Sequence, residues 1–114
     1  MTEPRVIHFE ILGEDQDKLM AFWGGLLGWK FDTSNQGGYG MTDPAQTGIV
    51  VGIGDKRGPS GHVTAYVRVA DINATLAKAV ELGGTVIMPR FSAGPEAWLA
   101  VVADPEGHVV GLSE

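Results

Sequence analysis

The chain has 114 residues, of which 44% are hydrophobic and 19% charged, with a formal net charge of −6 and no cysteine. This is the composition of one globular domain, and the missing cysteines exclude thiolate nucleophiles, zinc–thiolate sites and disulfides. The negative charge and the lack of Lys/Arg runs argue against nucleic acid and membrane partners. Because no signal-peptide or transmembrane pattern is present, we expect a cytoplasmic protein.

The first half of the chain is predicted to contain a strand, a helix and three short strands. Residues 5–12 alternate as a strand, with apolar residues on one face. Asp15 then caps a helix in which large apolar residues recur at helical spacing. Three strands follow at residues 29–32, 39–42 and 48–53, separated by turns that contain Gly, Asn and Pro.

The same order restarts after a glycine-bearing linker, residues 55–61. Residues 62–69 alternate as a strand, Asp71 caps a second helix, and Gly83 ends that helix. Three further strands are predicted at residues 85–88, 97–103 and 108–112. We therefore predict a single domain, residues 1–114, that contains two modules, 1–54 and 62–114, each with the order βαβββ.

An internal repeat supports this division. The pattern Gly-x-Val-Val-Gly-(Ile/Leu) occurs at residues 48–53 and again at 107–112, a shift of 59 (111 minus 52). Two helices for about eight strands, joined by turns too short for parallel crossovers, argue against a doubly wound α/β sheet. We predict an α+β fold in which the modules form a curved sheet with a ligand cup and helices on its outer face.

Several motifs in this order resemble a known superfamily. They are Val6-Ile7-His8-Phe9-Glu10, Met20-Ala21-Phe22-Trp23, Leu27-Gly28-Trp29, Val67-Arg68-Val69-Ala70-Asp71-Ile72, Leu82-Gly83-Gly84 and Asp104-Pro105-Glu106-Gly107. Together they resemble the vicinal oxygen chelate superfamily, which includes glyoxalase I, extradiol dioxygenases, methylmalonyl-CoA epimerase and bleomycin resistance proteins. The resemblance implies paired modules that enclose a small molecule.

The resemblance also implies four metal-ligand positions, which fall here on His8, Gly52, Thr64 and Gly111. The usual residues are His on the first strand of each module and Glu on the fourth. Glycine has no side-chain donor, and a catalytic divalent ion generally needs three protein ligands. We therefore expect a member of the superfamily that has no catalytic metal.

Two enzymatic alternatives stay open. A displaced site for a divalent metal could form from His8, Glu10 and His62, because Glu10 shares a strand face with His8 and His62 shares one with Thr64. Such a protein would be a lyase, an isomerase or a dioxygenase. Alternatively, His8 with Glu10 or Tyr66 could act as a metal-free acid–base pair.

Aromatic residues indicate the ligand class. Tyr39, Tyr66 and Trp98 fall on strands predicted to face the cup, and Phe91 falls in a loop, residues 89–96, that is expected to form its rim. Pockets with aromatic walls and few polar groups suit small organic molecules. The predicted ligand-binding residues are His8, Glu10, Tyr39, Met41, His62, Thr64, Tyr66, Phe91 and Trp98.

The sequence thus predicts a glyoxalase-like protein that binds a small apolar or aromatic organic molecule, with no cofactor favoured. Neither nucleic acid nor a membrane is expected as a partner. The family resemblance and the open sheet edges lead us to expect a homodimer.

Overall fold

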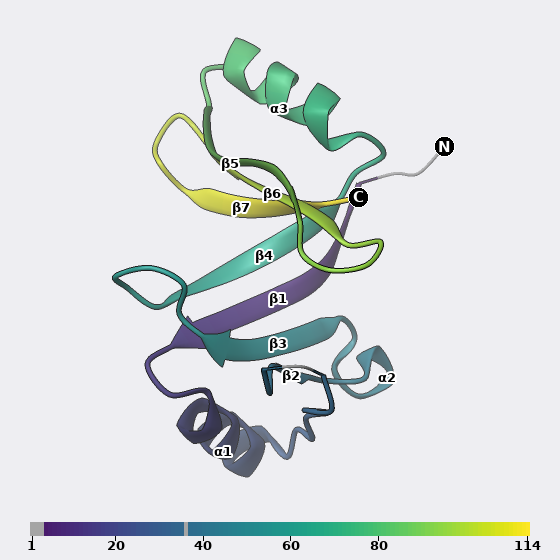
Figure 1. The fold of residues 1–114 in the computed structure, drawn as a ribbon, viewed down its shortest axis with the longest axis vertical. Helices are drawn as coiled ribbons and strands as arrows, with labels where there is room; N and C mark the ends of the chain where they lie inside the picture. Colours follow the sequence, from purple (N-terminus) through teal and green to yellow (C-terminus); the bar gives the residue numbers. More distant parts are fainter. Residues whose placement is uncertain (1–3, 36) are drawn as a thin grey trace. The chain divides into compact units, whose positions relative to one another are not determined.

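A computed structural model describes residues 4–35 and 37–114 and shows a mixed α+β fold with seven strands and three helices (Figure 1). In chain order the elements are β1 Arg5–Gly13, α1 Gln16–Leu27, β2 Gly40–Met41, α2 Pro44–Thr47, β3 Val50–Asp55, β4 His62–Arg68, α3 Ile72–Glu81, β5 Thr85–Ser92, β6 Trp98–Ala103 and β7 Val109–Ser113. The α+β class predicted from the sequence is confirmed. The chain forms two compact units, residues 8–64 and residues 65–114 together with those up to Ile7.

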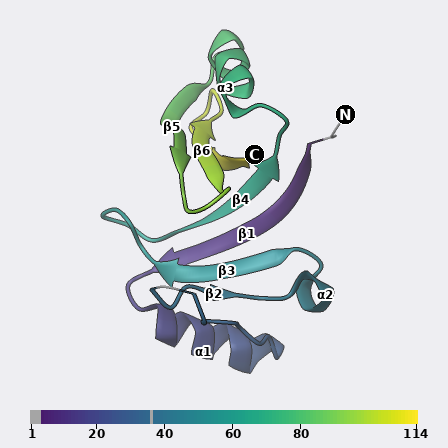
Figure 2. The ribbon, with the colours of Figure 1, turned by 45° about the vertical axis from the view of Figure 1, so that its right-hand side comes forward.

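In the unit of residues 8–64 the strand order is β2-β3-β1. β3 runs parallel to β1, with Glu10 opposite Gly52, and antiparallel to β2. Helix α1 lies against β3 (Figure 2). The side chain of Asp15 accepts the Lys18 N–H at 3.1 Å and caps α1 as predicted, and Gly28, with φ of 74°, ends it.

In the second unit the strand order is β4-β7-β6-β5, and α3 lies against β5 and β6. Asp71 caps α3 as predicted, by accepting the Ala74 N–H at 3.0 Å. The apolar side of α3 supplies two buried residues, Ile72 and Leu76, to the core of this unit. The order of elements from β4 onward is βαβββ, as expected.

Two predictions of secondary structure are wrong. Residues 29–32 form no strand beyond a single bridge between Asp32 and Met41. The side-chain amide of Gln46 takes both the N–H and the C=O of Lys30, at 2.8 and 3.1 Å, so these groups are not available to a strand partner. The predicted rim loop of residues 89–96 begins inside β5, where Phe91 pairs with Leu99.

Strand β5 accommodates its proline through irregular pairing. Its register with β6 shifts between Val86 and Met88 and again between Met88 and Phe91. Proline has no N–H to give to a ladder and is tolerated in strands at such irregularities. The strand therefore continues through Pro89, which the sequence analysis treated as its end.

Candidate functional site

Four polar side chains form a hydrogen-bonded chain in the unit of residues 8–64. The Tyr39 hydroxyl lies 2.9 Å from His8 Nε2 and donates to Glu10 Oε1, also at 2.9 Å. The other carboxylate oxygen, Glu10 Oε2, accepts from Arg57 Nη2 at 3.2 Å. The order is therefore imidazole, phenol, carboxylate and guanidinium.

The backbone explains why these groups meet. His8 and Glu10 are two residues apart on β1, so their side chains leave the same face of the strand. Tyr39 immediately precedes β2, and Arg57 lies in the loop that follows β3. Since β3 pairs with both β1 and β2, both residues are brought next to the face that carries His8 and Glu10.

In this hydrogen-bonded row of side chains, the negative charge of Glu10 is balanced by the positive charge of Arg57. Glu10 is only 5% exposed, and a buried carboxylate is costly unless it is paired and hydrogen-bonded. Arg57 supplies the opposite charge and Tyr39 a hydrogen bond. Glu10 therefore has both kinds of compensation that burial requires.

His8 is held in its neutral form. Its partial burial lowers the pKa below the usual 6.5, and the nearby negative charge of Glu10 raises it by a smaller amount. The single proton of the Tyr39 hydroxyl is donated to Glu10, so the hydrogen between His8 and Tyr39 must belong to Nε2 of His8. The hydrogen bond to Tyr39 thus fixes the orientation of the His8 ring and the tautomer that carries its hydrogen on Nε2.

The glycines of β3 make room for Tyr39. A Cβ atom at Gly52 would lie 1.8 Å from the Tyr39 hydroxyl oxygen and 2.6 Å from His8 Nε2. A Cβ atom at Gly54, two residues on and on the same face, would lie 2.6 Å from Cδ1 of the Tyr39 ring. No side chain larger than hydrogen fits at Gly52 while Tyr39 keeps its place.

The equivalent glycine of the repeat is also covered by a tyrosine. In the second unit a Cβ atom at Gly111 would lie 2.3 Å from Cδ2 and Cε2 of Tyr66, whose residue pairs with Gly111 across β4 and β7. Tyr66 is buried. At both expected metal positions, Gly52 and Gly111, a tyrosine therefore occupies the space that a side chain would need.

These contacts do not fit a metal site of the kind the resemblance implies. The space that a carboxylate at Gly52 or Gly111 would need is filled by Tyr39 or Tyr66. Within residues 4–35 and 37–114, no three His, Asp or Glu side chains are grouped so as to hold a metal ion. His8 and Glu10 are joined through Tyr39, and His62 is exposed on β4.

The other predicted ligand-binding residues are spread over both units. Met41 is exposed on β2, and Thr64 is buried on β4. In the second unit, Phe91 is half-buried, and the Trp98 ring lies under the Arg90 guanidinium, 3.9 Å from its carbon.

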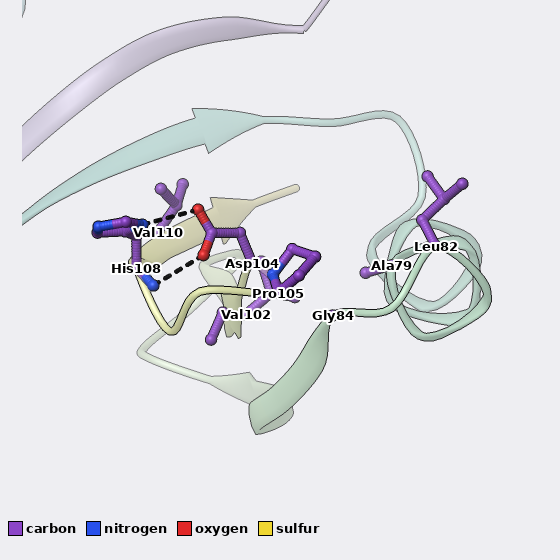
Figure 3. Close-up of a pocket in the computed structure, with 9 residues that line it drawn as sticks. Ala79, Leu82, Gly84, Val102, Asp104, Pro105, His108 and Val110 are labelled. Atoms are coloured by element: carbon purple, nitrogen blue, oxygen red, sulfur yellow. Dashed lines mark hydrogen bonds and ion pairs between the residues drawn. The ribbon is translucent and has the colours of Figure 1, made fainter.

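A separate hollow of about 270 Å³ lies in the second unit, between the end of α3 and the turn from β6 to β7 (Figure 3). Its wall includes Leu82, Val102 and Val110, and none of the predicted site residues. At its rim, Nδ1 of His108 pairs with Asp104 at 3.0 Å. The His108 side chain is exposed.

Arg57 is the member of the polar chain that the sequence analysis missed, because it lies in the segment interpreted as a linker. A usable signal existed. Glu10 falls on a strand predicted to be half-buried, and a buried carboxylate needs a cationic partner. Arg57 lies close after the strand that pairs with β1.

The family model for the glyoxalase-like domain matches residues 9–113, and the chain belongs to this family. The family model thus confirms the expected relationship to glyoxalase-like proteins. A solved structure of a glyoxalase/bleomycin resistance protein/dioxygenase superfamily member from Vibrio splendidus has a similar fold, with a TM-score of 0.67 at 16% identity, covering 97% of this chain and 98% of that one.

Two curated relatives have similar sequences. The chain is 32% identical over 106 residues to "Putative glyoxylase CFP32" of Mycobacterium bovis and of Mycobacterium tuberculosis. The match covers 86% of this chain and 41% of those proteins, so the chain spans about two fifths of their length.

Solved structures agree in fold at low sequence identity. The hypothetical protein BH1468 from Bacillus halodurans matches with a TM-score of 0.72 at 16% identity, covering 99% of this chain and 95% of that one. Methylmalonyl-CoA epimerase from Mycobacterium tuberculosis matches with a TM-score of 0.68 at 17% identity, covering 96% and 86%. At these identities the likeness shows the fold alone.

Among the described residues, no helix has the length and apolar composition needed to cross a membrane.

Proposed function

We propose that this glyoxalase-like domain binds a small apolar or aromatic organic molecule without a catalytic metal, and that the chain from His8 to Glu10 is the polar part of the site. The observation that carries the proposal is the 1.8 Å between the Tyr39 hydroxyl and the place of a Cβ atom at Gly52. A phenol thus stands where the resemblance implies a carboxylate ligand. A phenol is a poor replacement for a metal ligand but a good partner for an organic molecule.

The electrostatics support recognition of an organic ligand. His8 is neutral at pH 7, and Glu10 is compensated by Arg57. A site with little net charge and ordered hydrogen-bonding groups can orient a ligand whose apolar part supplies most of the binding energy.

Thermal unfolding tests the absence of a metal. The protein is treated with a chelator, and the melting temperature Tm is measured after addition of Ni²⁺, Mn²⁺, Zn²⁺ or Fe²⁺. A ligand that binds only the native state raises Tm, and the rise increases with the logarithm of the ligand concentration relative to Kd. We expect no specific shift with any ion. A large shift with one ion that disappears in His8→Ala would contradict the metal-free proposal.

Ligand binding is tested with a panel of aromatic and aliphatic fragments, followed by tryptophan fluorescence and by NMR. We expect at least one aromatic fragment to bind. Tyr39→Phe should weaken the binding, because this variant keeps the ring but loses the hydroxyl that links His8 and Glu10. Lys18→Gln, at an exposed position on α1 outside the predicted site, is the control and should keep wild-type affinity. A panel without any binder would refute the proposal.

A second function, metal-free acid–base catalysis, is favoured by the neutral His8 in a hydrogen-bonded chain. One solved protein of similar fold is an epimerase. Proton exchange tests this function directly. If His8 acts as a base, a fragment whose C–H is acidified by a neighbouring carbonyl group should exchange that hydrogen for deuterium in D₂O. NMR should show the exchange in the presence of the wild-type protein and not in the presence of His8→Gln.

A further inference from the structure

We propose that Arg57 recognises a carboxylate on the ligand, so that the molecule bound by this domain is a small organic acid. This inference rests on the proposed function, because it names the class of the molecule bound at the same polar chain. Arg57 contacts Glu10 of that chain at 3.2 Å and has a side chain that is 62% exposed.

The loop that carries Arg57 is held in place by its neighbours. The Asp55 carboxylate accepts the Gln16 N–H at 3.0 Å, at the start of α1. The Lys56 N–H donates to the Gly13 carbonyl at 2.8 Å, and its ammonium group pairs with Glu14. The two residues before Arg57 are thus fixed, and its guanidinium starts from a defined position beside β1.

The guanidinium of Arg57 has donors to spare. It carries five N–H groups in a planar fork, which matches the two oxygens of a carboxylate. Its hydrogen bond within the described part of the chain uses Nη2 alone, to one oxygen of Glu10. Most of the fork faces solvent next to the polar chain, so Arg57 can hold Glu10 and a ligand carboxylate together.

Arg90 shows how this chain builds an arginine with a structural role. Its Nε and Nη2 atoms both donate to Glu114, at 2.9 and 2.6 Å, and its plane covers the Trp98 ring. Two of the N–H donors of Arg90 are therefore bound to Glu114, and one face of its guanidinium is covered by the Trp98 ring. Among the described residues, Arg57 donates to a nearly buried carboxylate through Nη2, which leaves its outer side for a molecule that arrives from solvent.

The charge of Glu10 narrows the class of anion. A ligand that binds Arg57 lies close to Glu10, and like charges at short range repel one another. For a phosphate dianion both the attraction to Arg57 and the repulsion from Glu10 are about twice those of a carboxylate, so the second charge gains little beside this neutral pair and loses more hydration. The arrangement therefore favours an organic carboxylic acid, with the apolar remainder that the proposed function already requires.

Phenylacetate and its neutral amide, phenylacetamide, are the probes, with affinities measured by NMR titration. In Glu10→Gln/Arg57→Gln both charges are replaced by amides of similar shape, so the buried group is not left uncompensated. We expect phenylacetate to bind this double variant about tenfold more weakly than it binds wild type, the scale of a lost charge-assisted hydrogen bond. The affinity of the double variant for phenylacetamide should stay within about twofold of that of Glu10→Gln alone, because these two variants differ only at Arg57.

Glu10→Gln alone is the matched variant, because it keeps Arg57 and removes the like charge. It should bind phenylacetate at least as tightly as wild type. Arg68→Gln, at an exposed position on β4, removes a positive charge away from the polar chain and should have no effect. Equal phenylacetate affinities in the single and double variants would overturn the role of Arg57.

The two proposals fail in different ways. If phenylacetamide or another neutral fragment binds and phenylacetate gains nothing from Arg57, the organic-acid inference is wrong and the proposed function stands. If neither probe nor any member of the fragment panel binds, the proposed function itself is wrong.

Discussion

At Gly52 and Gly111 the absence of a side chain has a specific structural use. Both positions would carry metal-binding carboxylates according to the resemblance, and both are instead covered by tyrosines, Tyr39 and Tyr66. A glycine in a strand usually weakens it, since it has no side chain to pack and loses much conformational freedom on folding. Here the ring of a distant residue uses the space, so the glycine and its tyrosine form one packing unit.

Gly52→Ala should destabilise the protein by about 3 kcal/mol, because its Cβ atom would lie 1.8 Å from the Tyr39 hydroxyl oxygen. In the Tyr39→Ala background the same change should cost clearly less, because the clash with the hydroxyl is gone and only the 2.6 Å approach to His8 Nε2, at the end of a side chain, remains. Urea unfolding of the four proteins measures this coupling.

Gly25→Ala is the control for the glycine experiment. Gly25 lies inside α1, and nothing lies within 4 Å of the place where its Cβ atom would be. Alanine there should raise the free energy of unfolding by about 0.5–1 kcal/mol. An equal cost of Gly52→Ala with and without Tyr39 would show that the two residues are not in contact.

The lowered pKa of His8 predicts a pH dependence. Below pH 6.5 the unfolded chain binds a proton at this residue before the folded protein does, so protonation favours unfolding. Stability should be full above pH 6.5 and should fall as the pH decreases toward the pKa of folded His8. Urea unfolding across this range should show the decrease in wild type and in His62→Gln and a smaller one in His8→Gln. A slope that is unchanged in His8→Gln would assign it to another group.

At the scale of elements, one glutamate connects three parts of the second unit. The Glu114 carboxylate accepts the N–H of Ile72, at the start of α3, at 2.7 Å and binds Arg90 on β5. These bonds lower the pKa of Glu114 from its usual 4.5, the Ile72 N–H contributing most. A carboxylate at the N-terminus of a helix is also stabilised by the helix dipole.

Glu114→Gln should lower Tm by a few degrees at pH 7, because the amide loses the ion pair with Arg90 and the favourable charge at the start of α3. Since the folded pKa of Glu114 is lowered, its contribution is present above pH 4.5 and is lost as the pH falls through the folded value. The Tm difference between wild type and the variant should therefore shrink in acid. Glu106→Gln, in the exposed turn before β7, is the control.

The limits of sequence reading are visible in single elements. Asp15 and Asp71 were identifiable as helix caps because a cap depends on contacts three residues away. Residues 29–32 carry an apolar pattern that suits a strand, but the Gln46 side chain, 16 residues from Lys30, takes the backbone groups that a partner strand would need. Propensity gives no information about such a distant competitor.

At the scale of the molecule, the ordered motifs and the repeat were sufficient for the α+β class and the superfamily, since apolar periodicity and turn residues are local properties of the chain. The expected homodimer stays a prediction. The polar chain was predictable only in part. His8 and Glu10 were placed on one strand face and Tyr39 was predicted to bind the ligand, but neither the link through Tyr39 nor the contact with Arg57 was predicted.

The sequence by itself determined the succession of strands and helices, and it showed that two positions expected to bind metal have no side chain. Only the tertiary structure decided what fills those positions and which cation balances Glu10. The reason is separation along the chain. Tyr39 meets His8 across 31 residues and Arg57 meets Glu10 across 47, and such contacts depend on strand pairing and loop placement that no local pattern encodes.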